Sequence, residues 1–175
     1  MAGPKAMVMK SDFVLETETV SLVIQRVNED NSTPTDEELA LWAQAAVQGS
    51  RQHQITIRLV DELESRKLNL NYRKQDSATN VLSFPASLPE HIQNEIASID
   101  GRTSLGDLVI CVPLVTREAK DQSKPLLHHW AHLVIHGILH LLGHDHQETG
   151  QAEIMEKLEI DMLSTLGIDN PYTTD

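Results

Sequence analysis

Residues 125–146 have the sequence PLLHHWAHLVIHGILHLLGHDH, an apolar segment with histidines at regular intervals. Pro125 suits the first turn of a helix, and apolar residues follow at the three- and four-residue spacing of one helix face. These residues are Leu127, Trp130, Ala131, Val134, Ile138 and Leu141. The pattern predicts a helix over residues 125–142 that packs this face against the rest of the domain.

Three histidines of this segment have the spacing of ligands to one divalent metal ion. His136 and His140 are four residues apart, so on a helix they lie on one face, one turn apart. Gly143 can adopt the left-handed conformation that ends a helix, and the chain can then turn back to present His146. Three nitrogen ligands leave one position of a zinc ion open for water, as in catalytic sites. We therefore expect one Zn²⁺ per chain, bound by these three histidines.

Nearby residues leave alternatives open. His144 is a second candidate for the third ligand, although it follows the glycine by only one residue. His132 and His129 continue the histidine stripe, either as hydrogen-bond partners of the ligands or as solvated side chains. Asp145 could orient a ligand imidazole or bond to the loop backbone. The single cysteine, Cys111, excludes a cysteine-rich structural zinc site.

The histidine spacing also resembles the metzincin peptidase motif, with one difference. In that motif a glutamate follows the first histidine and acts as general base on the metal-bound water. Position 137 of this chain is a glycine. A metallopeptidase is therefore not expected.

The chain of 175 residues is long enough for one domain with its own core. We expect this domain to span residues 20–175, preceded by a flexible extension over residues 1–19. The extension has no apolar run of signal-peptide length, and the sequence has no segment of about 20 apolar residues that could span a membrane. A cytoplasmic protein with no membrane partner and no disulfide is expected.

The net charge of −12 is unevenly distributed. Residues 147–175 contain seven acids and one base, a net charge of −6, whereas residues 51–74 contain six bases and three acids, a net charge of +3. A basic face that binds nucleic acid is therefore compatible with an acidic protein, beside the alternative of a solvated surface with no partner.

The remaining sequence alternates strand and helix patterns. Strands are expected at 21–27, 54–60, 81–84 and 108–111, the last two as central strands, and helices at 35–49, 61–68, 114–122 and 151–166. Thr35 and Glu38 form a capping-box pattern, and the last helix is expected to pack Ile154, Leu158, Met162 and Leu166. Residues 86–103 are expected to be irregular. These elements predict an α+β fold, a small mixed β-sheet packed against several helices, with the metal site at the end of the central histidine-bearing helix.

Three sequence blocks resemble the bacterial YbeY endoribonuclease family. The first covers residues 68–85, with LNLNYR leading into Asp76 and TNVLSFP; the second is LGDLVI at 105–110; the third is the histidine motif at 136–146. Their order and spacing are similar to the family over roughly residues 21–172. The chain differs at His144, where the family commonly has tyrosine.

The resemblance implies a metal-dependent endoribonuclease that cuts single-stranded RNA. It implies a role in ribosomal RNA maturation, notably at the 3′ end of 16S rRNA, and in ribosome quality control, with the small ribosomal subunit and its assembly factors as partners. It further implies zinc at His136, His140 and His146, and Arg73 as the catalytic basic residue in the cleft. A guanidinium can bind two phosphate oxygens at once, which suits the charge that develops during phosphodiester cleavage.

Two other functions remain open from the residues alone. The chain could be a ribosome assembly factor that binds RNA around a structural zinc with little or no cleavage, because no carboxylate base is present at position 137. Aromatic residues, which stack on single-stranded RNA, make up only 3% of the chain. Hydrolysis of a small phosphate ester or amide ranks last.

Overall fold

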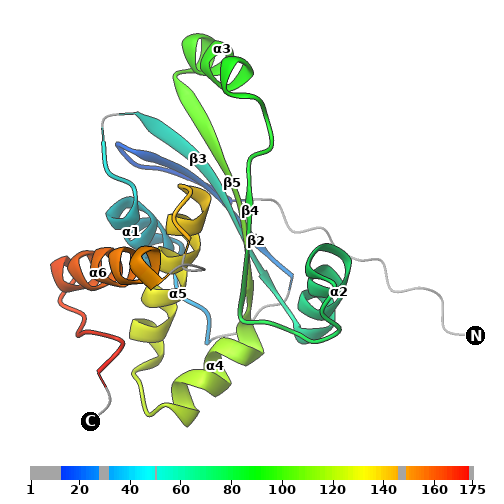
Figure 1. Cartoon of the computed structure of the whole chain (residues 1–175), viewed down its shortest axis with the longest axis vertical. Coiled ribbons are helices and arrows are strands. Elements are labelled where there is room, and N and C mark those ends of the chain that lie inside the picture. The colour runs from blue at the N-terminus through cyan, green and yellow to red at the C-terminus, as the bar shows by residue number, and fades with distance from the viewer. Residues whose placement is uncertain (1–12, 28–31, 50, 146–148, 174–175) are drawn as a thin grey trace, which may run out of the picture.

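The computed structural model describes residues 13–27, 32–49, 51–145 and 149–173. Within them the chain forms a five-stranded sheet in the order β1-β2-β3-β5-β4 (Figure 1). The strands are β1 (Phe13–Glu16), β2 (Val20–Arg26), β3 (Gln52–Val60), β4 (Val81–Pro85) and β5 (Arg102–Cys111). β2, β3 and β5 are parallel, and β1 and β4 pair antiparallel at the two edges. The expected mixed sheet is confirmed.

The helices are α1 (Asp36–Ala46), α2 (Glu62–Arg73), α3 (Glu90–Asp100), α4 (Val112–Asp121), α5 (Leu126–Leu141) and α6 (Thr149–Thr165). In Figure 1, α1, α5 and α6 lie on one side of the sheet and α2 lies on the other. The main core fills the space between the sheet and α5, with Ile55, Ile57 and Leu59 of β3 facing it. A smaller cluster with Val109 and Cys111 lies under α2. The α+β prediction is therefore confirmed, with α5 as its central helix.

The local signals in α1 are confirmed. The Thr35 hydroxyl accepts a hydrogen bond from the backbone N–H of Glu38, and the Glu38 carboxylate accepts one from the backbone N–H of Thr35. The apolar face predicted for this helix, which is Leu39, Trp42, Ala43, Ala46 and Val47, is buried throughout. A capping box and a helical period are local features, so they can be read without knowledge of the fold.

Several sequence expectations are wrong. β4 is an edge strand, not a central one, because strand order depends on contacts between distant segments. Residues 86–103 contain α3 and the start of β5. Ile92, Ile96 and Ile99 of α3 have the i, i+4, i+7 spacing of a helix face, a signal that the expectation overlooked, although no described side chain in α3 is buried. α2 continues to Arg73, five residues beyond the prediction. Asn69 lies inside this longer helix, and its side chain donates to the Ser77 carbonyl at 2.8 Å instead of competing for the helix backbone.

Two apolar residues expected in the core are exposed. Leu127 is 45% exposed because the first turn of α5 turns Leu126 toward the core instead. Ile154 is 59% exposed, and its neighbour Met155 is buried in its place. At the N-terminal end of α6, the buried face therefore lies one residue further along the sequence than predicted.

The expected N-terminal extension divides into two parts. Residues 1–12 lie outside the described residues. Phe13–Glu16 form β1, which pairs with Ser21–Ile24 of β2. The boundary between an extension and the domain remains a prediction.

Cys111 is fully buried and unpaired at the end of β5, and burial raises the pKa of its thiol. Among the described residues, no helix has both the length and the apolar character needed to cross a bilayer.

At Gly137 the backbone of α5 packs directly against side chains of the sheet. A Cβ atom placed there would lie 2.8 Å from Cδ2 of Leu108 and 3.3 Å from Cγ2 of Val81. The Ser83 hydroxyl of β4 donates a hydrogen bond to the Gly137 carbonyl at 3.1 Å. Position 137 thus faces the sheet, and a side chain there would require Leu108 and Val81 to shift.

We predict that Gly137→Ala destabilises the protein. Overpacking against the fully buried Leu108 costs about 1–3 kcal/mol, and the higher helix propensity of alanine offsets up to about 1 kcal/mol of it, so the net loss of stability is at most about 3 kcal/mol and centres on about 1–2 kcal/mol. Urea unfolding measures the difference. Gly150→Ala in α6 is the matched control, because its new Cβ meets nothing within 4 Å and stability should stay equal or rise. Equal stability of the two variants would contradict the packing account.

Candidate functional site

The C-terminal end of α5 forms the turn expected from the glycine. The helix ends at Leu141, and Gly143 has φ +93°. The backbone N–H of Gly143 donates to the His140 carbonyl, and that of His144 donates to the Leu139 carbonyl, each at 3.0 Å. These two bonds define a Schellman motif, so the predicted helix end is confirmed. His146, the predicted third ligand, lies outside the described residues.

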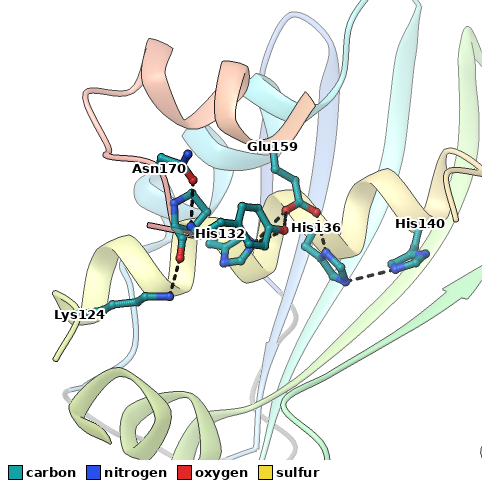
Figure 2. A network of polar contacts seen from close by, with 8 residues as sticks. Lys124, His132, His136, His140, Glu159 and Asn170 are labelled. Carbon is teal, nitrogen blue, oxygen red and sulfur yellow. Dashed lines mark hydrogen bonds and ion pairs between the residues drawn. The ribbon is translucent and has the colours of Figure 1, made fainter. Parts of the chain in front are cut away.

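His136 and His140 bring ring nitrogens together on one face of α5. Their Nε2 atoms are 3.2 Å apart, as Figure 2 shows at the right of the network. Two nitrogen ligands of one tetrahedral zinc ion, each about 2.0–2.1 Å from it, lie about 3.3 Å apart. The observed separation fits that arrangement. It also fits a hydrogen bond in which the Nε2–H of His140 donates to Nε2 of His136.

A buried carboxylate fixes the orientation of His136. Oε1 of Glu159, from α6, lies 2.6 Å from Nδ1 of His136, and Oε2 lies 3.0 Å from Nε2 of His132. The carboxylate accepts a third hydrogen bond from the Tyr172 hydroxyl, which donates to Oε2. Glu159 is fully buried. An ionised carboxylate only accepts hydrogen bonds, so His136 carries its proton on Nδ1 and turns the lone pair of Nε2 toward His140.

The three donors keep Glu159 ionised. Burial alone would raise the pKa of this carboxyl, but hydrogen bonds from His132, His136 and Tyr172 outweigh burial and lower the pKa to about 2. Burial, followed by the neighbouring carboxylate of Glu159, raises the pKa of the Tyr172 hydroxyl. The phenol therefore remains a donor at every physiological pH.

His132, His136 and Glu159 could also hold a metal ion directly, because each offers a ligand atom within 4.8 Å of the others. The two nitrogens of His136 thus face two different candidate positions. Nδ1 faces the buried Glu159, and Nε2 faces His140.

A cleft of about 480 Å³ opens beside His136 and His140. Arg73, the last residue of α2, lines it together with Ser83, His144 and Asp145. Nη2 of Arg73 donates to the Ser83 carbonyl at 3.3 Å. Among the residues that the structure describes, no carboxylate pairs with Arg73. The guanidinium is therefore available for an anionic group that enters the cleft.

Ser83 connects the two halves of this cleft. Its hydroxyl donates to Gly137 of α5, and its carbonyl accepts from Arg73 of α2. Ser83 is only 8% exposed. The edge strand β4 thus holds the histidine helix and the arginine at a fixed separation.

The structure brings together the described residues of the predicted metal and catalytic site. His136, His140, Arg73 and Asp145 line one cleft, and His132 lies one hydrogen bond from the Glu159 carboxylate. His129 is used elsewhere, because its Nε2 lies 2.9 Å from Oε2 of Glu118.

Sequence reasoning missed Glu159, Tyr172 and Ser83. In the sequence, Glu159 is one of the seven acids of residues 147–175. A signal was present, because Met155, Glu159 and Met162 follow the i, i+4, i+7 spacing of a buried helix face. A carboxylate within such a face needs buried donors, and the histidines of α5 supply them. Ser83 and Tyr172 gave no comparable local signal.

We predict that the Glu159 charge stabilises the fold in a pH-dependent way. Because its pKa is lower in the folded protein, this stability is complete above the ordinary value of 4.5 and is lost as pH falls toward 2. Between pH 5 and pH 3 the loss is about 2 kcal/mol for this group. Urea unfolding of chelator-treated protein should show a smaller loss in Glu159→Gln than in wild type.

Glu153→Gln is the control for this measurement, because Glu153 is exposed on the same helix. It should retain the wild-type pH dependence. If Glu159→Gln and Glu153→Gln lose the same stability between pH 5 and pH 3, the Glu159 carboxylate does not have the assigned role.

Comparisons with known proteins show similarity over most of the chain. The family model for endoribonuclease YbeY matches residues 24–167. Proteins named endoribonuclease YbeY from two strains of Pseudomonas putida are 53% and 52% identical over 157 residues, which cover 89% of this chain and 95% of each relative. A solution structure of a Thermotoga maritima protein is 24% identical, with a TM-score of 0.43, covering 78% of this chain and 87% of that one. The family match spans most of the chain, and the chain therefore belongs to the YbeY endoribonuclease family.

Proposed function

We propose that this protein is a zinc-dependent endoribonuclease that cuts single-stranded RNA, with zinc bound by His136, His140 and His146. The observation that carries this proposal is the 3.2 Å approach of the His136 and His140 Nε2 atoms at the edge of the cleft that Arg73 lines. Imidazole nitrogens are suitable zinc ligands, and two of them are already arranged around one point.

The Nε2 side of His136 is the better metal position for two reasons. Glu159 already accepts three hydrogen bonds, and a metal on its side would have to displace them. The carboxylate is also fully buried, whereas His136 and His140 line the open cleft. We therefore assign Glu159 as the group that orients His136, a common arrangement of carboxylate, histidine and zinc.

The chain's own residues supply binding and orientation for the reaction. Arg73 binds the non-bridging oxygens of the scissile phosphate with charge-assisted hydrogen bonds, which strengthen as negative charge develops on them. Ser83 holds this guanidinium on the side of the cleft opposite α5. When bound, zinc supplies a Lewis acid that can activate water or stabilise the leaving oxygen.

We further propose that the RNA is ribosomal, with maturation of the 16S rRNA 3′ end and ribosome quality control as the roles, in the cytoplasm and at the small ribosomal subunit with its assembly factors. The support is membership of the family, whose relatives are named endoribonucleases. The cleft supports an anionic substrate through Arg73, which pairs with no carboxylate among the described residues.

A ribosome assembly factor that binds RNA without cutting it is the second candidate. One observation favours it: Gly137 faces Leu108 and the sheet, so the peptidase position for a general base does not face the cleft at all. Asp145 is the only cleft carboxylate among the described residues.

We predict that the zinc affinities of two variants distinguish the position between His136 and His140 from the position between His132, His136 and Glu159. His140→Ala should abolish stoichiometric zinc binding, because it removes a direct ligand. His132→Ala should weaken binding by about 10- to 100-fold at most, because it removes only a partner of Glu159. Competition with a chromogenic chelator measures both. The reverse order of effects would move the metal to the His132, His136 and Glu159 group.

We predict that Arg73→Ala lowers the rate of single-stranded RNA cleavage by about 10²- to 10³-fold, because one donor to the developing phosphate charge is lost. The melting temperature should change little, since Arg73 is exposed and ends its helix. Lys67→Ala, an exposed cation on the same helix that lies outside the cleft, is the matched control.

Both variants are purified identically to the wild type, so that a contaminating ribonuclease would cut in all three preparations. Cleavage that persists in Arg73→Ala would remove the assigned role. Wild-type protein with stoichiometric zinc that binds ribosomal particles but leaves RNA intact would favour the assembly factor.

A further inference from the structure

A second cleft, of about 820 Å³, lies on the α2 side of the sheet. Its lining includes Arg73, Ser83 and Pro85, and the same three residues line the histidine cleft. The two clefts therefore meet across β4, with Arg73 at their junction. Because β4 is an edge strand among the described residues, an extended chain that enters one cleft can pass over it into the other.

The second cleft contains a presented aromatic ring. Tyr72, the neighbour of Arg73 in α2, is 65% exposed. Its ring contacts Phe84 of β4 edge-to-face, with centroids 5.1 Å apart and an interplanar angle of 67°. Phe84 is itself packed against the smaller core cluster. The exposed ring is thus held in place by an anchored one, which lowers the entropy lost when a ligand stacks on it.

The charges of this cleft suit a neutral ligand. Arg58 is paired with Glu64 through bonds of 2.7 and 3.2 Å, so neither group offers a full charge to a ligand. Asp107 also lines the cleft and would repel a phosphate. Arg73 stands at the junction and pairs with no carboxylate in the described part of the chain. A phosphate is therefore favoured at the junction and an uncharged, flat group beyond it.

We propose that Tyr72 is a stacking platform for the nucleobase adjacent to the phosphate held by Arg73. This subsite rests on the proposed function, because it requires single-stranded RNA in the histidine cleft. Stacking on an aromatic side chain tolerates any base, so the subsite contributes affinity for unpaired RNA without sequence selection. A base in a duplex has no exposed face to offer, so this site also disfavours double-stranded RNA.

The test measures binding of a single-stranded RNA oligomer to zinc-loaded protein, with the RNA checked for integrity on a denaturing gel after each titration. Tyr72→Ala should weaken binding by about 5- to 150-fold, the usual range for loss of one stacked base. Tyr72→Phe should bind like wild type, because the ring is retained. Leu70→Ala is the matched control, since Leu70 is 43% exposed on the same helix and lines neither cleft.

A spectroscopic readout identifies stacking itself. In oligomers with 2-aminopurine placed at successive positions, wild-type protein should quench the fluorescence at one position, and Tyr72→Leu should restore it. Equal affinities for Tyr72→Ala and Leu70→Ala, with unchanged quenching, would overturn this inference while leaving the proposed function intact. If wild-type protein binds no single-stranded RNA, the proposed function fails and the stacking site fails with it.

Discussion

The contact between α5 and the sheet at Gly137 sets how far the histidines of α5 lie from Arg73 across β4. Without a side chain at this position, the helix backbone reaches β4 and β5, where Leu108 and Val81 fill the space. Ser83 then bonds to the Gly137 carbonyl and to Arg73, which lie on opposite sides of β4. Cores are close-packed, so a shift of the helix by even a fraction of an ångström changes the separation of the histidines from the arginine. The glycine that stands in place of the peptidase base is thus also the residue at which α5 packs against the sheet.

The buried carboxylate of Glu159 also holds α5 in place, through its contacts with His132 and His136. Removing an ion from water is costly, and this carboxylate is accommodated only because three donors converge on it. Two donors come from α5 and one from the C-terminal segment, so a single charge connects α5, α6 and Tyr172 (Figure 2). The same bonds set the tautomer of His136. Stability and ligand orientation therefore depend on one group, and a change that improves one affects the other.

Local regularity explains what could be predicted from the sequence. The capping box at Thr35, the helical spacing of His136 and His140 and the turn at Gly143 each depend on neighbours within a few residues, and the structure contains all three. The edge position of β4, the sheet-facing side of residue 137 and the histidine donors to Glu159 depend on segments more than 20 residues away. Arg73 came from family resemblance alone, because nothing local distinguishes an arginine that ends a helix in a cleft from one that ends a helix in solvent.

The charge distribution explains how an acidic chain can present a site for RNA. At physiological ionic strength, charges separated by more than about 8 Å are largely screened, so the net charge of −12 matters less than the groups lining the cleft. Glu159 is enclosed by its donors, and Glu64 is paired with Arg58, so these acids project little negative potential into either cleft. Arg73 stands where the two clefts meet, without a carboxylate partner in the described part of the chain. Among the described residues that line the two clefts, Arg73 is the one cation without a carboxylate partner, and it gives an RNA strand one defined place for a phosphate. The groups on either side then determine what happens to the nucleotides that flank this phosphate.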